Sequence, residues 1–169
     1  MPETAWQQLP IQTSQDATLQ RVAPAPKILL AFDFGLKRIG IALGNTLTSI
    51  ARPLTTIHAE SNEARFAAIA ALIAEWRPDT LVVGRPLDTA AAVTEMTARA
   101  ERFGRQLQGR FGLPVKFIDE RYSSAVAEDA LKVGRADKHR IDAAAAAIIL
   151  QAWLDENSSD NRIENSTDT

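Results

Sequence analysis

Four acidic residues of this 169-residue chain stand beside apolar segments, where a carboxylate is out of place. Asp33 follows an apolar run over 28–32. Asp119 and Glu120 follow a second strand-like run, and Asp142 opens an alanine-rich stretch. Removing a carboxylate from water is costly unless a cation or a hydrogen-bond donor pairs with it. Carboxylate oxygens bind hard cations, so these acids would form a Mg²⁺ or Mn²⁺ site if the fold brings them together.

The elements that would position these acids form an α/β domain. Apolar runs bounded by glycine or proline predict strands, and helical periodicity predicts the helices between them. The predicted strands cover 27–33, 39–43, 49–57, 80–83 and 115–119, and the predicted helices cover 63–77, 96–111, 123–131 and 138–154. Short connections make the first three strands antiparallel, and helical crossovers make the last two parallel to the first. We therefore expect a five-stranded mixed sheet flanked by helices.

Three predicted strands end at one edge of that sheet, and ligands bind at such edges in open α/β sheets. Asp33, the turn that contains Arg85, and the Asp119-Glu120 pair all lie there. Alternation along a strand sends residues 119 and 120 to opposite faces, so one of them should meet Asp33, and both remain candidates. Asp142 shares a helical stripe with apolar residues at offsets of four, seven and eleven, so its side chain should point inward.

Each acid also has an ordinary structural explanation. An Asp before a glycine commonly caps a turn, and for Asp33 alone that explanation is as good as a functional one. Asp142 near the start of a helix would interact favourably with the helix dipole. The Asp119-Glu120-Arg121 triplet would otherwise form a surface ion pair of little energetic value.

Other nucleophilic or metal-binding residue types are poorly placed. The chain has no cysteine, which excludes a thiolate zinc site. His58 and His139 are expected to be isolated surface residues rather than a metal or nucleophile pair. Ser123 and Ser124 have no nearby base, so we expect them to cap the short helix that follows.

Composition and charge indicate one cytoplasmic, globular domain with two polar ends. The chain is 46% hydrophobic and 24% charged, which suits a single folded core. No apolar run approaches the ~20 residues of a membrane span, and no signal-like segment opens the chain. We expect a flexible leader over 1–26, one folded domain over 27–154 and a disordered acidic tail over 155–169.

Basic residues near the predicted acidic edge would suit a polyanionic partner. Cations beside a carboxylate–metal site are what a phosphate backbone needs for positioning. The candidate nucleic-acid-binding residues are Lys37, Arg38, Arg85, Arg121, Lys132, Arg135, Lys138 and Arg140. The last four belong to one basic loop that leads into the helix carrying Asp142.

Four motifs, in order along the chain, resemble the YqgF/RuvX family. They are Asp33-Phe-Gly-Leu-Lys-Arg-Ile-Gly-Ile-Ala, Leu81-Val-Val-Gly-Arg-Pro-Leu, Asp119-Glu-Arg-Tyr-Ser-Ser and Asp142-Ala-Ala-Ala-Ala-Ala-Ile-Ile-Leu-Gln151. The resemblance covers residues 27–154 and implies a ribonuclease H-like fold. It also implies an acidic site made of Asp33, one acid of the Asp119-Glu120 pair, and Asp142. The family pattern favours Glu120 over Asp119.

The resemblance implies a nuclease that hydrolyses phosphodiester bonds with Mg²⁺ or Mn²⁺ held by these acids. Its implied substrate is structured nucleic acid, first of all the 5′ end of the 16S ribosomal RNA precursor, with ribosomal particles as a further partner. Two alternatives stay open: a Holliday-junction resolvase in DNA recombination and repair, and a non-catalytic nucleic-acid-binding factor in ribosome assembly. Both a monomer and a homodimer are compatible with the sequence.

Overall fold

The computed structural model describes residues 25–58, 60–88, 90, 92–120 and 138–163. Its strands are β1 (Ile28–Phe34), β2 (Arg38–Asn45), β3 (Ile50–His58), β4 (Thr80–Arg85) and β5 (Val115–Asp119). Its helices are α1 (Asn62–Trp76), α2 (Glu95–Phe111) and α4 (Lys138–Ile163). Most of the predicted leader, the predicted helix over 123–131 with Ser123 and Ser124, and most of the basic loop lie outside the described residues.

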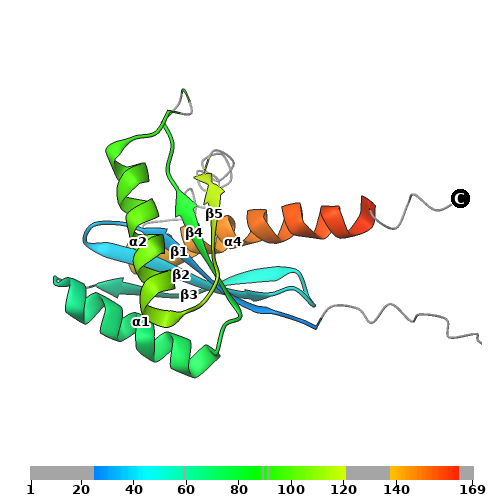
Figure 1. Cartoon of the computed structure of the whole chain (residues 1–169), viewed down its shortest axis with the longest axis horizontal. Coiled ribbons are helices and arrows are strands. Elements are labelled where there is room, and N and C mark those ends of the chain that lie inside the picture. Colours follow the sequence, from blue (N-terminus) through cyan, green and yellow to red (C-terminus); the bar gives the residue numbers. More distant parts are fainter. Residues whose placement is uncertain (1–24, 59, 89, 91, 121–137, 164–169) are drawn as a thin grey trace, which may run out of the picture.

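The five strands form one sheet in the order β3-β2-β1-β4-β5 (Figure 1). β2 is antiparallel to both β1 and β3, whereas β4 is parallel to both β1 and β5. Pro53 lies on the edge strand β3, where a residue without an N–H is tolerated, and the register shifts beside it. This strand order and these directions are those of a ribonuclease H-like fold, which confirms the predicted mixed sheet.

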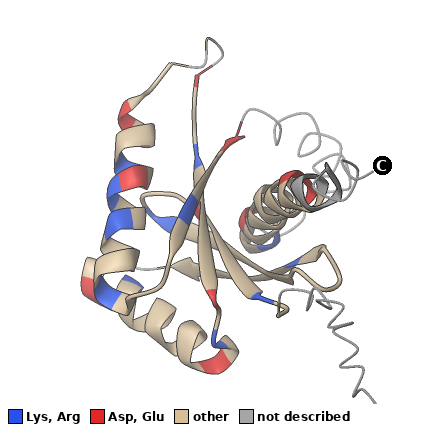
Figure 2. Cartoon of the chain, turned by 45° about the vertical axis from the view of Figure 1, so that its right-hand side comes forward, with Lys and Arg blue, Asp and Glu red and all other residues tan. Residues whose placement is uncertain are grey.

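The two faces of the sheet carry separate apolar cores. Leu30 and Phe32 of β1 pack with α1 and α2, whereas Leu29 and Ala31, the alternate residues, pack with α4. The helices α2 and α4 therefore lie on opposite sides of the sheet, as Figure 2 shows. A side chain at the end of a strand consequently faces either α2 or α4.

Polar caps and one glycine set the ends of α1 and α2. The Ser61 side chain accepts a hydrogen bond from the Ala64 N–H at the start of α1. Thr94 and Thr97 form a reciprocal capping box at the start of α2. Gly112 ends α2 with a φ of 65°, a left-handed conformation that glycine adopts without steric cost.

The helix α4 is longer than the sequence predicted. It continues to Ile163, whereas the sequence predicted its end at 154. This segment contains no glycine or proline that would stop a helix. Gln151 also donates a hydrogen bond to Asp155 one turn further on, which supports the helix beyond its apolar stripe. Despite its 26 residues, α4 is not apolar enough to cross a membrane, and neither is any other described helix.

Candidate active site

Asp33 lies at the carboxyl end of β1, on the face that α4 covers. Leu29 and Ala31 pack with α4, and a further step of two residues places the Asp33 side chain on the same face. Burial and the neighbouring negative charge of Asp142 raise the pKa of Asp33 from 3.8 to about 6. Within the described residues, no hydrogen-bond donor or cation pairs with its carboxylate. The turn-cap explanation of Asp33 therefore finds no support in the geometry.

Glu120, rather than Asp119, shares the α4 face with Asp33. Ile118 packs with α4, and Glu120 follows two residues later, with its carboxylate over Gly84 of β4. A Cβ added at Gly84 would come within 2.5 Å of Glu120 Oε1, so a glycine leaves the room that this side chain occupies. Burial, and then the charge of Asp33, raise the pKa of Glu120 from 4.5 to about 7. The placement favours Glu120 between the two candidates.

Asp119 faces the other side of the sheet, toward α2. Its Oδ1 accepts a hydrogen bond of 2.9 Å from Arg85 Nε, and Arg85 Nη1 lies 3.0 Å from Oε1 of Glu101 in α2. This network ties the ends of β4 and β5 to α2. It also directs Arg85 away from Asp33, so the structure does not bring this candidate nucleic-acid-binding residue to the acidic site.

Asp142 reaches the site because α4 rests directly on Gly40 of β2. Gly40 is the cross-strand partner of Asp33. A Cβ at Gly40 would stand 1.8 Å from the Asp142 carbonyl oxygen, so this close approach requires glycine. Ala146 and Ile149, on the same stripe of α4, are buried against the sheet. The apolar stripe that the sequence predicted is confirmed, and it anchors the helix beside β1 and β2.

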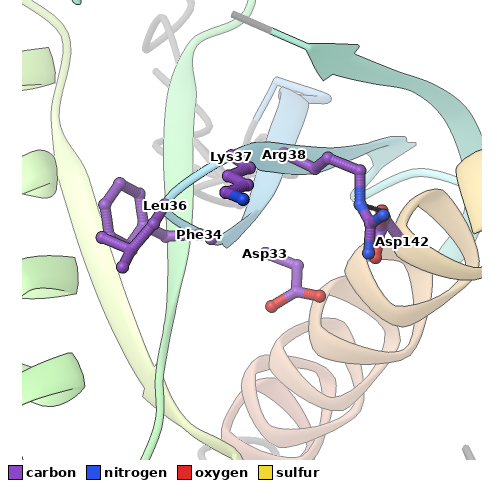
Figure 3. A pocket seen from close by; sticks show the side chains of 7 residues that line it. Asp33, Phe34, Leu36, Lys37, Arg38 and Asp142 are labelled. Atoms are coloured by element: carbon purple, nitrogen blue, oxygen red, sulfur yellow. Dashed lines mark ion pairs between the residues drawn. The ribbon is translucent and has the colours of Figure 1, made fainter. Parts of the chain in front are cut away.

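The β1-β2 hairpin and the start of α4 surround a cavity of about 230 Å³. Asp33, Lys37, Arg38 and Asp142 line it, together with the turn residues between them. Figure 3 shows the Asp33 carboxylate standing apart in this space, while Arg38 and Asp142 are joined at its side. Arg38 Nε lies 2.7 Å from Asp142 Oδ2, and both side chains are partly exposed to solvent.

Arg65 of α1 holds the tip of the β1-β2 hairpin. Its Nη2 donates a hydrogen bond of 2.7 Å to the Leu36 carbonyl oxygen, and its guanidinium lies over the ring of Phe34, 5.8 Å from the centroid. This contact fixes the wall of the cavity that bears Lys37 and Arg38. Sequence reasoning missed Arg65, because the contact spans 29 residues and no local pattern signals it.

The predicted nucleic-acid-binding residues are only partly brought together. Lys37 and Arg38 line the cavity, and Arg140 is exposed on the first turn of α4, which Lys138 begins. Three further candidates, Arg121, Lys132 and Arg135, lie outside the described residues.

Two histidines that were expected to be isolated form a pair instead. His58 ends β3 and His139 lies in the first turn of α4; His58 Nε2 is 2.8 Å from His139 Nδ1. The Thr56 hydroxyl donates a hydrogen bond to the His139 carbonyl oxygen. The prediction of isolation was wrong because the fold closes a separation of 81 residues. Both contacts attach the start of α4 to β3, three residues before Asp142.

Asp33, Glu120 and Asp142 offer donors that suit a hard divalent cation. They are three carboxylates on one face of the sheet, and a cation among them would replace mutual repulsion by attraction. Across the described parts of the chain, no three acidic or histidine side chains stand close enough to hold a metal ion as they are placed. The donor set fits, but the Asp142 carboxylate is turned to Arg38.

Comparisons with known proteins found a family model, relatives in sequence and a structural neighbour. A family model described as RuvX, Holliday junction resolvase, matches residues 27–156. A protein of Paraburkholderia phytofirmans, named for an expected role as a pre-16S rRNA nuclease, is 54% identical over 133 residues, which are 79% of this chain and 91% of the relative. A Paraburkholderia xenovorans protein of the same name is 53% identical over 133 residues, with the same coverage. Among solved structures, Thermus thermophilus RuvC in complex with a Holliday junction substrate aligns with a TM-score of 0.48 and 16% identity, over 78% of this chain and 96% of that one.

Proposed function

The chain belongs to the RuvX family of Holliday junction resolvases, and on this premise we propose that it is a metal-dependent nuclease that processes the 5′ end of the 16S ribosomal RNA precursor. The reaction class follows the family and the names of the close relatives. The substrate follows those names, which describe a pre-16S rRNA nuclease. The reaction would take place in the cytoplasm, on or beside ribosomal particles.

The observation that carries this proposal is that three carboxylates lie on the α4 face of the sheet, two of them with raised pKa values. Burial and the charge of Asp142 raise the pKa of Asp33, and burial and the charge of Asp33 raise the pKa of Glu120. Gly40 allows α4 to bring Asp142 to the same face. Buried acids that repel one another are expensive for the fold, and such arrangements cluster at functional sites.

The residues around the site have separate tasks in the proposed reaction. Asp33, Glu120 and Asp142 would hold Mg²⁺ or Mn²⁺. When bound, the cation would polarise a phosphoryl oxygen and lower the pKa of a water molecule. Lys37 and Arg38 would bind the phosphate backbone of the nucleic acid, because they line the cavity that contains Asp33. Arg65 would keep this basic hairpin in place from α1.

A cleavage assay with matched variants tests the proposal. The wild-type protein should cut an RNA transcript that carries the 5′ end of the 16S precursor, and only when Mg²⁺ or Mn²⁺ is present. Asp33→Asn should remove cleavage while the protein stays folded, and Asp119→Asn, on the opposite face, should retain it. Cleavage in excess chelator, or equal cleavage by Asp33→Asn, would contradict a metal-dependent site at Asp33. Tight RNA binding without cleavage would instead favour a non-catalytic assembly factor.

Resolution of branched DNA is the second candidate function, because the matching family model is described as a Holliday junction resolvase. A four-way junction has two-fold symmetry, so cutting it symmetrically requires a homodimer. The same assay with a four-way DNA junction distinguishes the candidates. Cleavage of the junction but not of the RNA transcript, by a protein that is dimeric in solution, would favour the resolvase.

A further inference from the structure

The carboxylate of Asp142, the third acid of the proposed site, forms an ion pair with another side chain of the protein, that of Arg38. Arg38 Nε lies 2.7 Å from Asp142 Oδ2. This oxygen is buried and accepts no hydrogen bond within the described residues, so the contact with Arg38 is an ion pair. Within the described residues, Asp142 is the acid that pairs with Arg38. Figure 3 shows the Asp33 carboxylate separate from this pair. The three acids therefore lie on one face of the sheet, but their carboxylates are not close enough together to bind one cation. This agrees with the described residues, among which no three acidic or histidine side chains are placed to hold a metal ion.

The backbone at Asp142 is fixed by packing against the sheet, so only the side chain of Asp142 can move. The Asp142 carbonyl rests on Gly40, the residue that pairs with Asp33 across the strands. Ala146 and Ile149 bury the following turns of α4. Whether the Asp142 carboxylate joins Asp33 thus depends on the rotation of its side chain, and in this structure that rotation places Oδ2 against Arg38.

Arg38 can exchange this partner for a phosphate. The Arg38 side chain is 37% exposed and lines the cavity, so an anion that enters there can reach it. Guanidinium groups bind phosphate oxygens in a two-pronged geometry, which a single Nε contact to a carboxylate does not use fully. A partly exposed ion pair adds little net stability, so the exchange is energetically easy.

We propose that Arg38 is a substrate-operated latch: it withholds the Asp142 carboxylate until a phosphodiester group binds the guanidinium, and the released carboxylate then completes the cation site with Asp33 and Glu120. This inference rests on the proposed nuclease function. Its consequence is that divalent cation and nucleic acid strengthen each other's binding, because coupling between two ligands is reciprocal. The free protein would then bind the cation weakly and assemble its site on substrate.

The binding of Mn²⁺, followed by the loss of the free-ion signal in electron paramagnetic resonance, tests the latch without any cleavage. The probe for the phosphodiester is dimethyl phosphate, which carries the charge and geometry of the backbone but no base. In its absence, Arg38→Gln should bind Mn²⁺ at least about fivefold more tightly than the wild type, a typical size for such coupling. Dimethyl phosphate should tighten Mn²⁺ binding to the wild type and leave Arg38→Gln unchanged.

Two further variants separate the latch from a general effect of charge. Lys37→Gln removes the same charge from the same cavity, and Mn²⁺ binding should tighten less than in Arg38→Gln. In an Asp142→Asn background, the effect of Arg38→Gln should disappear. Weaker Mn²⁺ binding by Arg38→Gln would show that Arg38 positions Asp142 for the cation, and it would overturn the latch.

The same experiment distinguishes failure of the latch from failure of the proposed function. If the wild type binds Mn²⁺ through Asp33 but Arg38→Gln and dimethyl phosphate change nothing, only the latch is wrong. If neither the wild type nor Arg38→Gln binds Mn²⁺, both are wrong. A second measurement uses the wild type alone and so does not depend on whether a variant folds. In NMR spectra, the Nε–H resonance of Arg38 should shift when dimethyl phosphate and Mg²⁺ are added together. A resonance that stays in place would overturn the latch.

Discussion

Replacing Asp33 by Asn should stabilise the protein when no divalent cation is present. In the folded state the pKa of Asp33 is about 6, against 3.8 for an unburied Asp. The folded protein therefore binds more protons than the unfolded chain between these two pH values, and its stability falls as the pH rises through them. A rise of one unit in the pKa corresponds to about 1.36 kcal/mol, so at pH 8 the ionised Asp33 lowers the free energy of unfolding by about 3 kcal/mol. Asn has nearly the same shape and cannot ionise, so the variant escapes this penalty.

Thermal unfolding in the presence of EDTA measures this effect. At pH 8 the melting temperature of Asp33→Asn should exceed that of the wild type by several degrees, since about 1 kcal/mol corresponds to roughly 2–4 °C for a chain of this size. The advantage should shrink toward pH 4, where Asp33 is protonated in the folded wild type. Saturating Mn²⁺ should raise the melting temperature of the wild type and not that of the variant. A variant that melts at or below the wild-type temperature at pH 8 would refute the reasoning.

Three other variants test the surroundings of the site. Gly40→Ala places a Cβ against the Asp142 carbonyl, so it should cost about 1–3 kcal/mol in chemical denaturation and weaken Mn²⁺ binding, and a neutral result would show that α4 can move away freely. Glu120→Gln should weaken Mn²⁺ binding in calorimetric titration, whereas Asp119→Asn should leave it unchanged; the reverse result would reassign the ligand. His58→Ala removes the ring contact that attaches the start of α4 to β3, so it should lower the unfolding free energy by about 1 kcal/mol, and unaltered stability would make the contact incidental.

The sheet could be predicted from the sequence because its signals are local. Apolar runs ended by glycine or proline mark the strands, and connection length decides whether neighbours are parallel, which places Asp33 and the Asp119-Glu120 pair at one edge. The end of α4 was predicted too early, because the apolar stripe of the helix ends near 154 and the residues that follow are polar. A polar, acidic segment without glycine or proline continues a helix when its side chains bond to the preceding turn, as Gln151 and Asp155 do.

Long-range pairing explains what the sequence did not disclose. The choice between Asp119 and Glu120 depends on which face of β5 packs with α4, and both Phe117 and Ile118 are apolar, so alternation alone could not decide it. The ion pair between Arg85 and Glu101 could not be predicted either, since Glu101 lies on α2, which packs on the face of the sheet opposite the site. Such contacts follow from packing between elements, and no short motif records them.

The most direct test of the cation site is the anomalous scattering of crystals grown with Mn²⁺ and a phosphodiester oligonucleotide. We expect an anomalous peak on the α4 face of the sheet, bound by carboxylate oxygens of Asp33, Glu120 and Asp142. Asp119 should remain paired with Arg85 on the other face. A peak bound by Asp119, or crystals whose Mn²⁺ lies away from Asp33, would contradict the central claim that these three acids form one divalent cation site.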